Sequence, residues 1–103
     1  MSTSIQELDR WIDAPRESEH MEFKEAKNQF DVAKLYRYCV AIANEGGGKL
    51  ILGVSDKLPR KVVNSEAFRN TADIAEKIFS KLRFRVDVEE IVHPGGGQVF
   101  FFL

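Results

Sequence analysis

The feature that most constrains the fold is a short, almost uninterrupted apolar run, KLILGVS at residues 49–55. Three consecutive glycines precede this run, and the polar stretch DKLPR follows it. An apolar run of this length between turn-forming segments is typical of a strand that is covered on both faces. We therefore expect a sheet with this strand at its centre.

The remaining periodicities predict three helices and three further strands around it. Helical spacing and capping residues mark the helices, and alternation marks the strands. The expected caps of the three helices are Ser4, Asp31 and Thr71 in chain order. The expected order is helix 4–14, strand 21–24, helix 31–45, strand 49–55, helix 71–82, strand 83–92 and strand 99–103. This α-β-α-β-α-β-β order predicts an α+β fold with a small mixed sheet of about four strands and about three helices.

The apolar positions of these elements predict one core. Its expected members are Ile42, Leu50, Leu52, Val54, Ile74, Ile78, Val86 and Val88. Phe79 is also expected to point inward, and alternation places Phe84 and Val92 on the buried face of the strand 83–92. The single cysteine, Cys39, cannot form an internal disulfide and is expected to be a buried small hydrophobe in a reducing compartment.

Composition fits one domain without a membrane span. The chain has 103 residues, of which 44% are hydrophobic and 30% charged. No apolar run approaches the roughly 20 residues that a spanning helix needs, and the polar start is unlike a signal peptide. We expect a cytoplasmic protein with no membrane partner. Because the chain stops in the apolar strand VFFFL, residues 1–103 are expected to be an N-terminal fragment of a longer protein.

The charge is close to balanced overall but unevenly distributed. The formal net charge is −1, whereas residues 31–61 carry six basic and three acidic side chains and residues 1–30 carry four basic and seven acidic ones. A global basic field is therefore absent, and the positive middle permits a local phosphate-binding patch.

The glycine-rich segment AIANEGGGKLILGVSD, residues 41–56, excludes two common phosphate sites. It lacks the Gly-Lys-Ser/Thr ending of a P-loop, and its glycines follow a helix instead of preceding one. A dinucleotide-binding fingerprint fails for the same reason. The glycines are instead expected to end the helix 31–45.

Together with ESEHMEFKEA at residues 17–26, this segment resembles the Schlafen AlbA-type domain family, and specifically a bacterial member. The matching positions are Glu17-Ser18, Glu22-Phe23-Lys24, Ala43-Asn44, Gly46-Gly47, and Ile51 through Gly53-Val54 to Asp56. The resemblance covers about residues 15–93. One departure is the stretch Lys57-Leu58-Pro59-Arg60, where family members commonly continue into a glycine turn, so contacts made by that loop are expected to differ.

The strand 21–24 carries an acid and a base on one face, for which two interpretations remain open. Glu22 and Lys24 could form a solvated ion pair. Alternatively, Glu17, Glu22 and Asp56 could converge and hold Mg²⁺ or Mn²⁺, with Lys24 stabilising charge on a scissile phosphate. The resemblance implies the second interpretation, since ribonuclease-active Schlafens are described with an acidic trio at these positions. Glu17, Glu22, Lys24 and Asp56 are therefore the candidate catalytic residues.

Three functions follow, and the sequence does not choose finally among them. The resemblance implies a nucleic-acid-binding module of a larger regulator, which needs no cofactor and contacts mostly the backbone. Its candidate residues are Lys24, Lys27, Lys34, Arg37, Lys57, Arg60 and Lys61. The alternatives are a metal-dependent nuclease and a protein-interaction domain without nucleic-acid contact. Trp11, Tyr36 and Tyr38 are interpreted as packing residues, and DNA versus RNA and the pairing of two copies in a homodimer are left open.

Overall fold

The computed structural model of the protein describes residues 4–13 and 21–102. Within these residues the elements follow the expected order. They are α1 (Ile5–Ile12), β1 (Met21–Lys24), α2 (Val32–Asn44), β2 (Lys49–Leu52), α3 (Thr71–Leu82), β3 (Val88–His93) and β4 (Gly97–Phe102). The α+β class is confirmed. No helix in the described part of the chain is long and apolar enough to cross a membrane.

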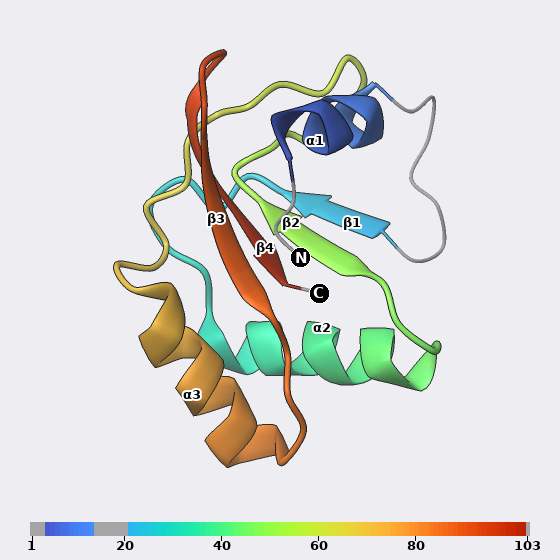
Figure 1. The fold of residues 1–103 in the computed structure, drawn as a ribbon, viewed down its shortest axis with the longest axis vertical. Helices are drawn as coiled ribbons and strands as arrows, with labels where there is room; N and C mark the ends of the chain where they lie inside the picture. The colour runs from blue at the N-terminus through green and yellow to red at the C-terminus, as the bar shows by residue number, and fades with distance from the viewer. Residues whose placement is uncertain (1–3, 14–20, 103) are drawn as a thin grey trace.

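The strands form one mixed sheet in the order β1-β2-β4-β3 (Figure 1). β2 pairs in parallel with β1 and antiparallel with β4, and β4 pairs antiparallel with β3. The predicted central position of the apolar run is confirmed, because β2 has a strand on each side. β1 and β2 are parallel, so the chain crosses between them through α2.

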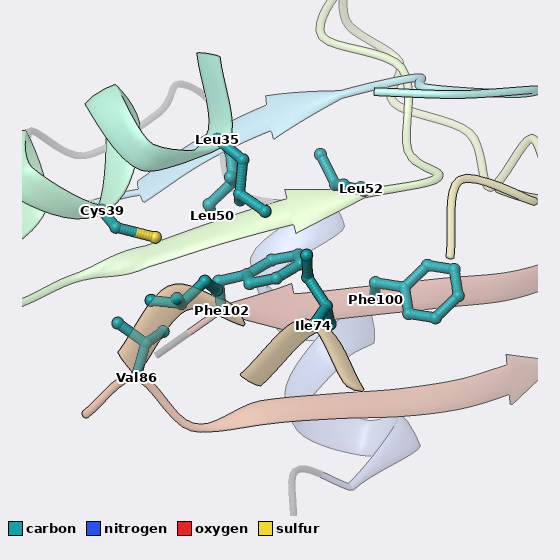
Figure 2. Packing of buried hydrophobic residues seen from close by; sticks show 9 residues of the cluster. Leu35, Cys39, Leu50, Leu52, Ile74, Val86, Phe100 and Phe102 are labelled. Atoms are coloured by element: carbon teal, nitrogen blue, oxygen red, sulfur yellow. The ribbon is translucent and has the colours of Figure 1, made fainter. Parts of the chain in front are cut away.

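The sheet is covered on both faces, and alternation along β2 supplies both cores. Leu50 and Leu52 pack with residues of α2 and α3, and Phe100 and Phe102 lie in the same cluster (Figure 2). On the opposite face, Ile51 packs in a second cluster with residues of α1 and β4. Helices α2 and α3 therefore form one layer, and α1 covers the other face (Figure 1).

Most of the predicted core is confirmed. The prediction of one core is wrong, because the sheet separates two clusters: Val54 is buried in the cluster beside α1, and the other buried members, Leu50, Leu52, Ile74, Ile78 and Val86, lie in the α2–α3 cluster. The other two predicted members, Ile42 and Val88, are partly buried and pack against the edge of the α2–α3 cluster. Cys39 lies inside that cluster, as expected.

Two predictions about buried apolar residues are wrong. Val92 is 69% exposed. It lies four residues after Val88, the first residue of β3, and close to the hairpin turn. At about 3.3 Å per residue, this separation carries Val92 beyond the part of the sheet that α3 covers. Phe79 is 47% exposed and lines an open groove between α3 and the segment 85–88.

The helix ends follow capping chemistry, with one correction. Ser4 caps α1 in a reciprocal capping box with Glu7, and Asp31 caps α2. The predicted cap of α3, Thr71, is wrong: the preceding Asn70 accepts hydrogen bonds from the Ala72 and Asp73 backbone N–H groups. Both residue types favour the N-cap, and extended backbone at position 70 decides between them.

The glycines after α2 end it as expected. Gly47 N–H donates to the Ile42 carbonyl at 3.0 Å, and Gly46 N–H donates to the Ala43 carbonyl at 3.1 Å. These two bonds form a Schellman motif, with Gly46 at a φ of +86°. The chain then turns directly into β2.

Candidate nucleic-acid interface

Lys24 occupies the last position of β1, beside the exit of the central strand. In the parallel register it pairs with Leu52, and its carbonyl accepts a hydrogen bond from Gly53 N–H at 2.9 Å. Gly53 has a φ of +101°, and a Cβ there would lie 2.6 Å from the Gln98 carbonyl oxygen. Only glycine fits this close approach. The backbone thus fixes the end of β1 against the segment that leads to Asp56.

Three polar side chains on different elements raise the pKa of Lys24. A side-chain hydrogen bond to Tyr38 of α2 is the main cause that raises its pKa above the ordinary 10.5, and the charges of Glu22 and Asp56 raise it further. Partial burial opposes these effects without reversing them. Lys24 Nζ lies 4.0 Å from Glu22 Oε2 and 5.8 Å from the centroid of the Tyr38 ring. Lys24 is therefore a fixed cation at neutral pH.

The loop after β2 is closed at its base by a pair of hydrogen bonds. Ser55 N–H donates to the Lys61 carbonyl at 2.9 Å, and Lys61 N–H donates to Ser55 Oγ at 2.8 Å. Asp56, Lys57 and Lys61 are exposed on this loop. The loop thus presents both signs of charge close to the end of β1.

Arg60 differs from the other predicted basic residues. It is 6% exposed, its Nη1 donates to the Ile12 carbonyl at 3.2 Å, and its guanidinium lies 4.6 Å from the centroid of the Phe23 ring. This side chain ties the loop to the end of α1 and to β1. Its burial leaves no access to a phosphate, so we omit it from the interface.

The other predicted cations near β1 lie on α2 and on the segment before it. Lys34 and Arg37 are exposed on α2, and Lys34 Nζ lies 5.9 Å from the centroid of the Phe30 ring. Lys27 is also exposed, with its Nζ 4.0 Å from Glu25 Oε1. At such exposure this ion pair contributes little to stability. It leaves Lys27 available for another anion.

Comparison with known proteins supplies the family. A family model described as Schlafen, AlbA_2 matches residues 17–99. The chain belongs to the Schlafen AlbA_2 family. The match runs from before β1 into β4 and leaves α1 outside. No curated protein and no solved structure matches the chain.

The acidic trio expected of this Schlafen AlbA_2 domain lies partly outside the described residues. Glu17 is not among the described residues. Glu22 and Asp56 are, and the charge of each raises the pKa of Lys24. Across residues 4–13 and 21–102, no group of three histidine, cysteine or acidic side chains could hold a metal ion. Two carboxylates remain, and their oxygen atoms are the donors that Mg²⁺ and Mn²⁺ prefer.

The packing interpretation of Tyr38 is confirmed, because its ring packs against the core cluster of α2 and α3, as the Phe30 ring also does. The contacts that these two rings make with lysines are not predicted by the sequence. The rings lie 6.2 Å apart between centroids, and each has a lysine ammonium nearby. The available signal was the spacing of Lys34 and Tyr38, four residues apart and thus on one helix face. The contact with Lys24 depends on tertiary packing, which that spacing does not reveal.

Proposed function

We propose that the domain binds nucleic acid, mainly through contacts between exposed basic side chains and backbone phosphates. The observation that carries this proposal is that Lys24 of β1 and Lys34 of α2 lie beside the neighbouring rings of Tyr38 and Phe30. We use the term basic corner for these two lysines together with Lys27 and Arg37, which are exposed and lie nearby in the sequence. Membership of the Schlafen AlbA_2 family supports the same function.

The charges around the basic corner favour weak, salt-dependent binding with little base reading. Glu22, Glu25 and Asp31 lie among the four cations in the sequence, so the local excess of positive charge is small. Three of the four cations are lysines, and two of these, Lys24 and Lys27, lie outside α2. Both features disfavour paired planar contacts with base edges. Phosphate contacts position a protein on nucleic acid without specifying sequence. No cofactor is required.

Lys57 and Lys61 extend the proposed interface along the loop after β2. Both are exposed, and the Ser55–Lys61 hydrogen bonds hold the base of their loop. The same loop carries Asp56, whose charge raises the pKa of Lys24. A nucleic-acid strand crossing the end of β1 would therefore meet the basic corner first and this loop next.

Paired charge-removal variants test the proposal. Lys27→Ala with Arg37→Ala removes two exposed cations of the basic corner, and Lys77→Ala with Lys81→Ala removes two exposed cations of α3 as a matched control. Fluorescence anisotropy with a labelled oligonucleotide at low salt should show a loss of about tenfold for the first pair. The control pair should change affinity by less than about twofold. Equal losses in both pairs would mean that only the net charge matters.

A metal-dependent nuclease is the second candidate, favoured by the position of Lys24 near both Glu22 and Asp56. Glu22 and Asp56, with Glu17 from the part of the chain not described, would hold the ion. Bound Mg²⁺ or Mn²⁺ would neutralise charge on a scissile phosphate. Lys24 would hold a non-bridging oxygen of that phosphate. If neither binding nor cleavage is found, the remaining alternative is a protein-interaction domain.

A further inference from the structure

Four side chains form a continuous surface strip in which cations and aromatic rings are linked. Lys24 Nζ lies 5.8 Å from the Tyr38 ring centroid, the Tyr38 and Phe30 centroids are 6.2 Å apart, and Lys34 Nζ lies 5.9 Å from the Phe30 centroid. We call Lys24, Tyr38, Phe30 and Lys34 the cation–aromatic strip. It joins β1, α2 and the segment between them.

The aromatic rings of the strip pack against the core, whereas its lysine side chains are exposed or partly exposed to solvent. Phe30 and Tyr38 are partly buried and pack against the core cluster of α2 and α3. Lys34 is exposed, and the Lys24 side chain is 31% exposed. The planes of the Phe30 and Tyr38 rings are inclined by 34° to each other. The core thus fixes the position of both rings, which remain partly exposed to solvent.

Resting on the proposed function, we infer that the strip binds a single strand, with bases stacked on Phe30 and Tyr38 and phosphates on Lys24 and Lys34. Single strands present the flat faces of their bases, which a duplex hides within its own stack. At Phe30, stacking a base on the ring is worth more than the exposed cation–π contact of Lys34 that it replaces. The displaced Lys34 ammonium group then becomes free to contact the phosphate of the same nucleotide, whereas Lys24 keeps its side-chain hydrogen bond to Tyr38.

The order of the strip also gives the bound strand a path across the domain. Lys24 is its last member and the one that contacts Glu22 and is acted on by Asp56. A base stacked on Tyr38 would therefore bring a backbone phosphate next to Lys24 and the Glu22 carboxylate. Lys24 is thus shared between the strip and the candidate catalytic site.

The test compares three ligands of about 12 nucleotides: a single strand, a duplex, and an abasic strand that carries phosphates without bases. The wild-type chain should bind the single strand at least about tenfold more tightly than the other two. Tyr38→Leu and Phe30→Leu should each remove most of that preference while leaving affinity for the abasic strand within about twofold. Tyr36→Leu, on the same helix but outside the strip, is the matched control and should retain the preference.

The outcomes separate this inference from the proposed function. If the wild type binds none of the ligands, both fall together. If it binds all three equally, phosphate binding stands and the strip has no role. Tyr38→Phe controls for folding, because it keeps the ring and should retain the preference. Loss of the preference in both Tyr36→Leu and Tyr38→Leu would also overturn the inference, since the effect would then be a general one on α2.

Discussion

His93 Nε2 lies 2.6 Å from Asp9 Oδ1, which joins α1 to the hairpin of β3 and β4 across 84 positions. Gly95 N–H donates to His93 Nδ1 at 2.9 Å, so Nδ1 carries no proton and Nε2 is the donor to Asp9. This side-chain pair lies on the sheet face that α1 covers. The backbone of the hairpin turn thus sets the tautomer that contacts α1.

Removing this pair should loosen α1 without unfolding the sheet. Asp9→Ala and His93→Ala should each destabilise the protein, and a double-mutant cycle should give a coupling of about 0.5–1 kcal/mol because Asp9 is half exposed. Urea unfolding followed by the emission of Trp11, which packs on Phe101, measures it. Additive single effects would show that the pair contributes nothing to the docking of α1.

Gly53 should tolerate no side chain, because a Cβ there meets the Gln98 carbonyl at 2.6 Å and φ is +101°. Gly53→Ala should cost roughly 2–4 kcal/mol of unfolding free energy. Gly46→Ala is the control, since Gly46 also has a positive φ but has open space around it. Its cost should be about 1 kcal/mol, from backbone strain alone. Equal costs for the two variants would contradict the close approach at Gly53.

Cys39 should make stability fall with rising pH in a defined window. Burial raises the pKa of its thiol from 9.0 to about 11, so the folded state holds the proton more tightly than the unfolded state does. The contribution of the protonated Cys39 thiol to the free energy of unfolding is then fully present below about pH 9 and is lost as the pH rises towards 11. Relative to Cys39→Ala, the wild type should lose roughly 1–3 kcal/mol more across this window. Parallel stability curves for the two proteins would be contrary to this expectation.

The elements were predictable because local signals agreed with the packing. The apolar run of β2 and the caps Ser4 and Asp31 each act within a few residues, and the sheet then places them consistently. The exposure of Val92 was not predictable, because apolar alternation continues along β3 beyond the part of the strand that α3 covers. The extent of a strand's cover is a tertiary property.

The site was predictable only in part. The charge pattern named Lys24, Lys34 and the nearby cations, but it could not distinguish the buried Arg60 from exposed neighbours. The burial of Arg60 depends on α1 and β1, which lie far from it in the sequence. The contact between Tyr38 and Lys24 was likewise not predictable, because it requires α2 to pack beside β1.

The nuclease candidate makes a separate prediction about the full chain. With Mg²⁺ or Mn²⁺ present, cleavage of RNA or single-stranded DNA should be stopped by a chelator and abolished by Glu22→Gln or Asp56→Asn. Glu25→Gln is the matched control, because Glu25 is exposed just after β1 and pairs with Lys27 instead of Lys24. Cleavage that survives Glu22→Gln, or that falls equally in Glu25→Gln, would exclude the carboxylates near Lys24 as its source.

The salt dependence of binding tests nucleic-acid recognition most directly. Anisotropy of a labelled single strand of about 12 nucleotides is measured with the wild-type chain between about 50 and 200 mM salt. If the four side chains of the basic corner each contact a phosphate, log affinity should fall against log salt with a slope of about −2.8, or roughly fiftyfold over this range. Lys27→Ala with Arg37→Ala should halve that slope. Absence of binding at the lowest salt, or binding that salt does not weaken, would contradict the proposed function.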